Sequence, residues 1–270
     1  MVLYIVGGGL SCDYLTKKAV EVLKSADKIY IDSYTSIAPG IDNSLAQNLG
    51  INSNRIIIAN REMLENRSHL IIYEAETQKV AVLVPGDPLI ATTHISLVIE
   101  AKRRNIEVEI IPGVSGIYAS IALSGLQFYR FGKPVTLVYP DEPFIPYTTL
   151  TTVKENKERN LHTLILLDLR LDEGKAMTVP EAVQLLLDIE EKMSREGVID
   201  KPVMRDSIIV GIARAGLPDF KCIAGAYSKV KNETYPPPPH SLIITAPRLH
   251  PTEREALTLL CNLHEEQKEH

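Results

Sequence analysis

The sequence predicts an α/β protein with two domains, and three observations lead to this. Short runs rich in β-branched residues alternate with amphipathic stretches of helical spacing. The chain has 270 residues, which corresponds to about two domains at roughly 150 residues each. A turn-rich stretch near residue 112 separates a first series of strands from a second. We therefore expect an N-terminal α/β domain with a glycine loop over residues 1–112, and a C-terminal α/β domain with a terminal helix over residues 113–270.

The first domain is expected to consist of strands joined by helices. The strands are predicted at residues 2–6, 28–31, 55–59, 80–84 and 106–111. A helix is predicted from Leu15 to Ala26 with Asp13 as its N-cap, and another over residues 89–104. Strands separated by helices of this length indicate βαβ crossovers, so this sheet should be largely parallel.

The second domain opens with a helix of small residues at 117–124 and continues with its own strands. These are predicted at residues 134–139, 163–167, 207–213 and 241–245, with a loop at 141–146. Thr178 and Glu181 have the spacing of a capping box for a long helix. Thr252 and Glu255 have the same spacing, which predicts a last helix running to about residue 266.

Composition excludes several classes of protein. Hydrophobic residues make up 45% and charged residues 23%, ordinary values that exclude a disordered chain, a fibrous repeat and a small disulfide scaffold. No apolar run approaches the roughly 20 residues of a membrane span. Residues 1–6 read as a strand rather than a signal peptide, so we expect a cytoplasmic protein without a membrane partner.

The charge balance argues against a nucleic-acid partner. Asp and Glu number 34 against 29 Lys and Arg, whereas a protein that binds the phosphate backbone is expected to be basic. The basic cluster Lys102-Arg103-Arg104 falls at the end of a predicted helix, where it is expected to be solvated and to complement the helix dipole.

The three cysteines, Cys12, Cys222 and Cys261, lie far apart in the sequence. None has the spacing of a metal site, and no metal is predicted. We expect free thiols, as is usual for a cytosolic chain.

Three loops are candidates for a ligand site, because ligands of open α/β sheets bind at the carboxyl ends of the strands. They follow the strands at 2–6, 80–84 and 106–111, and they contain Gly7-Gly8-Gly9-Leu10, Pro85-Gly86-Asp87-Pro88 and Pro112-Gly113-Val114-Ser115-Gly116. The triple glycine alone is equally consistent with a tight turn. It is not a dinucleotide fingerprint, since Cys12 stands where the third glycine is required. That departure speaks against a dinucleotide oxidoreductase.

Asp87 and two histidines allow both structural and functional interpretations. Asp87 is either a turn or N-cap residue, or a contact to a polar small molecule. His94 falls in the first turn of a predicted helix, where a structural role is the more common one. His240 stands directly before a buried strand, and both roles remain open.

These motifs together resemble a known family. The glycine loop and the Gly-Asp-Pro loop resemble those of the tetrapyrrole methylase superfamily. Four further segments are similar to the archaeal type of diphthine synthase: YTS at 34–36, GDPLIATTH at 86–94, GLQFYRFGK at 125–133 and PHSLI at 239–243. They occur in the family's order and spacing across essentially the whole chain.

The resemblance implies two α/β domains of the tetrapyrrole methylase type with the active-site cleft between them. It also implies transfer of methyl groups from S-adenosyl-L-methionine to the modified histidine of translation elongation factor 2, and a homodimer. Carried over residue by residue, the implied cofactor contacts are Leu10, Asp87, Ile90, Ser115, Gly116, Leu167, Ala213 and His240. The positions at Leu167 and Ala213 are fixed only to within one residue. No catalytic base is implied.

The chain departs from the family's pattern at two places. It has GVSG at 113–116 where an Asn-Ala-Ser-Ile type of sequence is usual, although the serine is kept. It also has Ser11-Cys12 after the glycine loop, where the family commonly has acidic residues, and Asp32-Ser33 before the YTS segment, where the family has a Glu. The rival functions are a uroporphyrinogen or precorrin C-methyltransferase, for which more basic residues near the glycine loops are expected, and a non-catalytic nucleotide-binding module.

Overall fold

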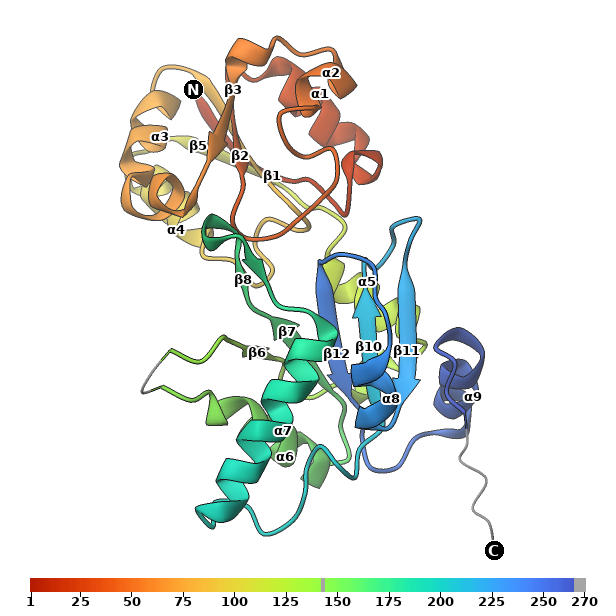
Figure 1. Cartoon of the computed structure of the whole chain (residues 1–270). Coiled ribbons are helices and arrows are strands. Elements are labelled where there is room, and N and C mark those ends of the chain that lie inside the picture. Colours follow the sequence, from red (N-terminus) through yellow and green to blue (C-terminus); the bar gives the residue numbers. More distant parts are fainter. Residues whose placement is uncertain (142–143, 265–270) are drawn as a thin grey trace, which may run out of the picture. The chain divides into compact units, whose positions relative to one another are not determined.

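The structure is a computed structural model that describes residues 1–141 and 144–264. Packing divides it into two units (Figure 1). The first holds Met1–Gly116 together with Leu169–Lys175, and the second holds Ile117–Asp168 together with the chain from Ala176 onward. The predicted domains at 1–112 and 113–270 remain predictions, because a division by packing does not show which segments fold independently.

The first unit contains a five-stranded sheet in the order β3-β2-β4-β1-β5. All of its strand pairs are parallel, as the alternating pattern predicts. Strand β1, next to the central strand β4, pairs with β4 on one side and β5 on the other, so that Val6 lies opposite both Leu83 and Ile111. The strands are β1 (Val2–Gly7), β2 (Lys28–Asp32), β3 (Ile56–Ala59), β4 (Lys79–Val84) and β5 (Glu107–Ile111).

Helices cover both faces of this sheet, and each face has its own apolar core. The helices are α1 (Lys17–Ser25), α2 (Leu45–Leu49), α3 (Ser68–Ala75) and α4 (Ile95–Arg103), with single turns at Cys12–Tyr14, Ser53–Arg55 and Glu62–Asn66. Two predicted starts are wrong. The N-cap of α1 is Thr16 rather than Asp13, because the hydroxyl of Thr16 accepts from the backbone of Ala19. Helix α4 begins at Ile95 rather than residue 89, since residues 88–94 form a loop with Ala91 at φ 58°.

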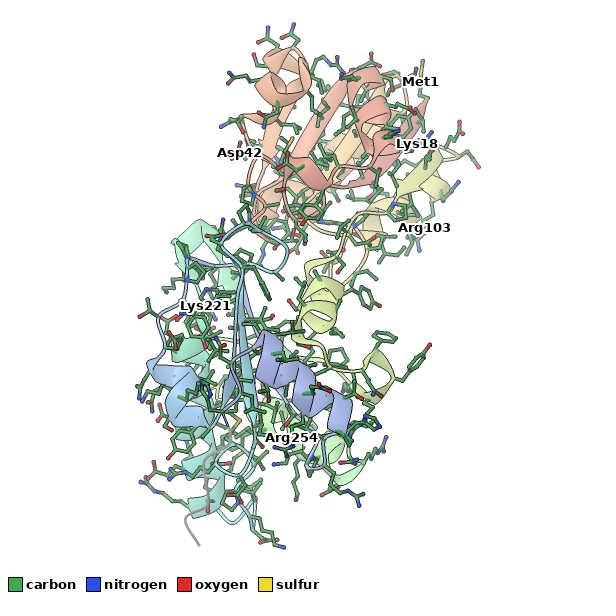
Figure 2. The ribbon with its side chains drawn as sticks, turned by 90° about the vertical axis from the view of Figure 1, so that its right-hand side faces the viewer. Met1, Lys18, Asp42, Arg103, Lys221 and Arg254 are labelled. Carbon is green, nitrogen blue, oxygen red and sulfur yellow. A yellow bond between two sulfur atoms is a disulfide. The ribbon has the colours of Figure 1, made fainter. Side chains whose placement is uncertain are left out.

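The basic cluster at the end of α4 is solvated, as predicted. Lys102, Arg103 and Arg104 are exposed, and Figure 2 shows Arg103 at the surface. The side chain of Arg104 pairs with Glu76 at 3.2 Å and with Glu100 at 3.4 Å. The cluster therefore has a structural explanation within its own unit.

The second unit contains a five-stranded sheet in the order β11-β10-β12-β7-β6. Unlike the first sheet, it is mostly antiparallel: β11–β10, β10–β12 and β12–β7 are antiparallel pairs, and β6–β7 is a parallel pair. The strands are β6 (Val135–Leu137), β7 (Thr163–Leu167), β10 (Ile209–Ala213), β11 (Lys221–Gly225) and β12 (His240–Ile244). Strand β11 was not predicted from the sequence. A separate small hairpin of β8 (Leu169–Arg170) and β9 (Lys175–Ala176) belongs, up to Lys175, to the first unit.

The helices of the second unit pack against its sheet in two apolar cores. They are α5 (Gly116–Ser124), α6 (Tyr147–Glu158), α7 (Val179–Arg195), α8 (Tyr227–Asn232) and α9 (Pro251–Leu260), with a single turn at Phe128–Arg130. The single turn at Leu171–Glu173 lies in the β8–β9 hairpin and belongs to the first unit. The capping box of Thr178 and Glu181 is confirmed at α7. At α9 the box is formed by His250 and Glu253 instead of Thr252 and Glu255. The predicted end near residue 266 lies outside the described residues.

Within the described ranges, every helix is too short or too polar to cross a membrane.

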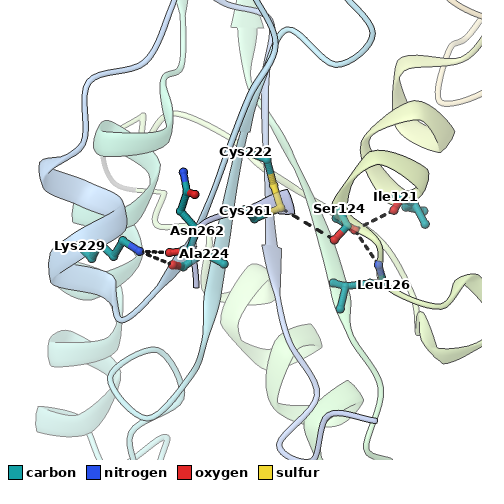
Figure 3. Close-up of a disulfide and its surroundings, with 8 residues drawn as sticks. All are labelled: Ile121, Ser124, Leu126, Cys222, Ala224, Lys229, Cys261 and Asn262. Carbon is teal, nitrogen blue, oxygen red and sulfur yellow. Dashed lines mark hydrogen bonds between the residues drawn. A yellow bond between two sulfur atoms is a disulfide. The ribbon is translucent and has the colours of Figure 1, made fainter. Parts of the chain in front are cut away.

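The expectation of three free thiols is wrong for two of the cysteines. Cys222 on β11 and Cys261 directly after α9 form a disulfide (Figure 3). Their Cα atoms are 4.7 Å apart although 39 residues separate them in sequence. The pairing follows from the packing of α9 beside the edge strand β11, which sequence spacing does not reveal. Cys12 is free, and burial raises the pKa of its thiol.

Candidate functional site

Three glycines bring together the loops after β1, β4 and β5. A Cβ on Gly113 would lie 2.2 Å from the carbonyl oxygen of Gly86 and 2.8 Å from the Cα of Gly7. A Cβ on Gly7 would lie 2.4 Å from the backbone nitrogen of Gly113. The three loops therefore touch through their main chains, and residues with side chains do not fit at Gly7 and Gly113.

Hydrogen bonds join two of these loops further. Gly9 donates to the carbonyl of Gly86 at 3.1 Å, and Gly86 donates back to Gly9 at 2.8 Å. The backbones of both residues lie in the left-handed region, with φ 71° and 76°, which glycine adopts without strain. The triple glycine is therefore more than an isolated turn. Together with the loops after β4 and β5 it forms one edge, which we call the rim, where Gly7, Gly86 and Gly113 are in contact.

Asp87 links the same rim to the loop that follows it. One carboxylate oxygen, Oδ1, accepts from the backbone of Leu89 at 3.0 Å, and Oδ2 accepts from the backbone of Gly113 at 3.2 Å. The interpretation as a turn residue is confirmed. The interpretation as an N-cap is wrong, because α4 begins only at Ile95.

At Gly86 and Gly116 of the rim, few neighbouring atoms cover the backbone, and the apolar side chain of Leu10 lies beside Gly116. A Cβ on Gly116 would meet only Leu10 Cδ2, at 3.7 Å, and one on Gly86 would meet only the backbone nitrogen of Gly116, at 3.9 Å. Ser115, directly before Gly116 in the chain, is 8% exposed, whereas Ile90 is 37% exposed. The first unit thus gathers Leu10, Asp87, Ser115 and Gly116 in one place. Backbone groups beside a leucine fit a small ligand with a flat apolar part and polar edges, such as a nucleoside.

The second unit brings together the other three predicted residues. Ala213 lies directly opposite His240 in the pairing of β10 with β12. Ser241 lies opposite Leu166, so Leu167 stands next to His240 at the same end of the sheet. Ala213 has no exposed surface and Leu167 has 7%. The next residue, Arg214, has φ 55° and pairs with Asp219 at 2.6 Å.

Both ring nitrogens of His240 form hydrogen bonds within the second unit. Its Nδ1 accepts from the backbone of Val179 at 3.1 Å, and its Nε2 donates to the carbonyl of Pro236 at 2.7 Å. Accepting at Nδ1 requires the neutral ring, and burial lowers the pKa of His240 in agreement with this. The neutral ring of His240 therefore already has hydrogen-bond partners at both nitrogens.

The first unit also contains a buried polar network that was not predicted from the sequence. Asp32, the last residue of β2, and His94, directly before α4, are both 1% exposed and lie within hydrogen-bond distance of each other. Tyr34 of the YTS segment is also buried and donates to Glu65 at 3.0 Å. Only the position of Asp32 at the carboxyl end of a strand could have suggested a role, because nothing in the sequence pairs it with His94.

The GLQFYRFGK segment belongs to the second unit and divides into a buried and an exposed part. Arg130 binds the fully buried carboxylate of Glu253, which also accepts from His162 at 3.0 Å. Phe131 packs against the apolar core of the unit. Phe128 is 54% exposed.

Comparison with known proteins agrees with this fold. The model of the tetrapyrrole (corrin/porphyrin) methylases matches residues 2–225. A diphthine synthase from Staphylothermus marinus is 45% identical over 97% of this chain and 95% of its own length. One from Methanocaldococcus jannaschii is 37% identical over 92% of this chain and 93% of its own.

Solved structures give the same result. A crystal structure of a diphthine synthase superposes with a TM-score of 0.85 at 30% identity, covering 98% of this chain and 97% of that one. A putative diphthine synthase from Entamoeba histolytica superposes with a TM-score of 0.84 at 31% identity, covering 98% and 99%. The chain therefore belongs to the diphthine synthase family of the tetrapyrrole methylases, and it is an S-adenosylmethionine-dependent methyltransferase.

Proposed function

We propose that this protein transfers methyl groups from S-adenosyl-L-methionine to the amino group of the modified histidine of translation elongation factor 2, giving diphthine in diphthamide biosynthesis. The observation that carries the proposal is the 45% identity to a diphthine synthase along almost the entire chain. The loop at 86–94, which distinguishes that family from other tetrapyrrole methylases, lies at the rim where Gly7, Gly86 and Gly113 meet.

The proposed cofactor contacts fall into two groups. In the first unit they are Leu10, Asp87, Ile90, Ser115 and Gly116, where bare backbone and the leucine side chain would receive the nucleoside part. In the second unit they are Leu167, Ala213 and His240, neighbours at one end of the sheet. Ala213 is fully buried and the ring of His240 is engaged. These positions would therefore contribute through main-chain groups or through the adjacent residue.

The reaction asks little covalent chemistry of the protein. S-adenosylmethionine would supply a methyl group on a sulfonium centre, where in-line attack by a neutral amine forms the N–C bond, breaks the S–C bond and leaves S-adenosylhomocysteine. The chain's own residues hold the reacting groups at near-attack distance, an effect that can lower a barrier by several kcal/mol, up to about 7–11 in the most favourable cases. An α-amino group has a reference pKa of about 8, so a fraction is neutral near pH 7 without a dedicated base. No general base is assigned.

We also propose that the protein is a cytoplasmic homodimer that works on the elongation factor as its protein substrate. The support is the resemblance to the family. Light scattering after gel filtration at micromolar concentration tests the assembly, and a monomer mass would remove this part of the proposal.

The function is tested by transfer of labelled methyl from S-adenosylmethionine to archaeal elongation factor 2 that carries the unmethylated precursor. The matched control is the same factor with its target histidine replaced. Label on the first factor only is the expected result, and mass spectrometry of that product counts the methyl groups. If neither factor is labelled while S-adenosylhomocysteine still binds, the substrate assignment is wrong and uroporphyrinogen or a precorrin is tested next.

A further inference from the structure

A buried hydrogen-bonded pair joins two loops at the carboxyl edge of the first sheet. Nε2 of His94 lies 2.7 Å from Oδ2 of Asp32, and both side chains are at most 1% exposed. Because an ionised carboxylate only accepts hydrogen bonds, Nε2 must carry the proton of this bond. Neither residue belongs to the set proposed to contact the cofactor.

Asp32 also shapes the turn that follows its own strand. Its Oδ1 accepts from the backbone nitrogens of Tyr34 at 2.8 Å and Thr35 at 3.1 Å, and its Oδ2 accepts from the hydroxyl of Thr35. Each carboxylate oxygen thus has two donors, which satisfies a charge that would be costly to bury alone. These bonds fix the position of the Asp32 carboxylate, and its hydrogen bond with His94 fixes the position of the imidazole.

The hydrogen bond between His94 and Asp32 matters for the loop at residues 87–94, because hydrogen bonds hold this loop at both ends and its backbone is strained in the middle. At its start, Asp87 accepts from Leu89 and from Gly113. At its end stands His94. Between them, Ala91 has φ 58°, a conformation that strains a residue with a side chain and persists only where the surroundings enforce it. Loss of either anchor would let Ala91 relax and would move Ile90 beside it.

A second contact supports the same end of the loop. The hydroxyls of Thr93 and Tyr34 both lie close to Oε1 of Glu65, at 3.2 Å and 3.0 Å. The guanidinium of Arg61 lies 5.1 Å from the centre of the Tyr34 ring. The YTS and GDPLIATTH segments are therefore joined by side chains that the proposed cofactor site does not use.

We infer that Asp32 and His94 form a positioning pair, which holds the 87–94 loop in the shape that presents Asp87 and Ile90 to the cofactor. The inference rests on the proposed function for the identity of that ligand. Both residues act through the loop, since their burial keeps them from touching the ligand.

Two substitutions of His94 separate this role from a general loss of packing. In His94→Gln the amide nitrogen can reach the place of Nε2 and donate to Asp32. In His94→Asn, one methylene shorter and equally polar, it falls short. We expect His94→Asn to raise the dissociation constant of S-adenosylhomocysteine, measured by calorimetry, by about tenfold. We expect His94→Gln to stay close to wild type. At saturating cofactor, the methyl-transfer rate of both variants should approach that of wild type.

His162 provides the matched control. It is also fully buried, and its Nε2 lies 3.0 Å from Glu253 in the second unit. His162→Asn should destabilise the protein as much as His94→Asn and leave the affinity for S-adenosylhomocysteine unchanged. If His94→Asn does not fold, Asp32→Asn, which keeps an acceptor for the turn but offers an N–H to His94, takes its place and should weaken binding alike.

Equal affinities for wild type, His94→Asn and Asp32→Asn would overturn the inference. So would equal weakening by His94→Asn and His162→Asn. Wild-type protein that does not bind S-adenosylhomocysteine would instead overturn the proposed function, which keeps the two failures distinguishable.

Discussion

The imidazole of His240 accepts a hydrogen bond from the backbone amide of Val179, the first residue of α7, with Nδ1 and N 3.1 Å apart. A charged ring could not accept this bond. Burial lowers the pKa of His240, and it lowers the pKa of His162 in the same way.

This arrangement predicts a pH-dependent stability. In the unfolded chain both histidines titrate near 6.5, whereas the folded protein keeps them neutral to lower pH. The unfolded state therefore binds more protons below about pH 6.5, and the free energy of unfolding should fall as the pH drops through this value, by at most about 1.4 kcal/mol per pH unit for each histidine. Urea unfolding at several pH values measures it. His240→Gln should reduce the slope and His69→Gln, at an exposed position, should not.

Two glycines of the rim should respond differently to alanine. Gly113→Ala places a methyl group against the backbone of Gly86 and Gly7 and should lower the free energy of unfolding by about 1–3 kcal/mol. Gly116→Ala meets only Leu10, at 3.7 Å, so the fold should tolerate it. The added methyl group would occupy the space assigned to the cofactor and should weaken binding of S-adenosylhomocysteine by about tenfold. Unchanged affinity in Gly116→Ala would place the cofactor elsewhere.

Asp87→Ala should weaken cofactor binding because two backbone amides, those of Leu89 and Gly113, lose their acceptor. We expect about a tenfold rise in the dissociation constant in calorimetry. Asn52→Ala is the control. Its side chain accepts from Asn54 in a similar turn, but before β3 begins and therefore at the opposite edge of the parallel sheet. Equal affinity of Asp87→Ala and wild type would contradict the role.

The disulfide should stabilise the second unit. Linking Cys222 to Cys261 closes a loop of about 39 residues, for which chain entropy predicts about 4 kcal/mol. Urea unfolding of the variant with both cysteines replaced by alanine should show a loss of this order, and a reductant should give the same loss in wild type. Cys12→Ala, which removes the free thiol, controls for substitution as such. A reductant that leaves the midpoint unchanged would show that the bond contributes nothing.

The strands of the first sheet were predictable because each is marked by residues that are close together in the sequence. Buried parallel strands such as β1 and β4 appear as short apolar runs, and glycine and proline mark the loops after them. The start of α4 was not predictable, because the turn at Ala91 is imposed by anchors at Asp32 and Gly113 that lie far away in the sequence.

The second unit was harder to predict for a related reason. Its strands were mostly found, but β11 was missed, and with it the position that brings Cys222 to Cys261. Antiparallel neighbours such as β10 and β12 are joined by long connections, so their register depends on packing rather than on a short turn. The eight cofactor positions came from resemblance. The structure adds that five of them lie in the first unit and that the other three lie at one end of the sheet of the second unit.

The contact of Gly7, Gly86 and Gly113 has one more consequence. Loops that meet through carbonyl oxygens and α-carbons cannot shift separately, so the carboxyl edge of β4, β1 and β5 behaves as a single rigid body. The groups in contact are peptide groups, whose positions do not depend on side-chain rotamers. A small molecule arriving there would meet a surface that is already formed, and its association would order little additional backbone.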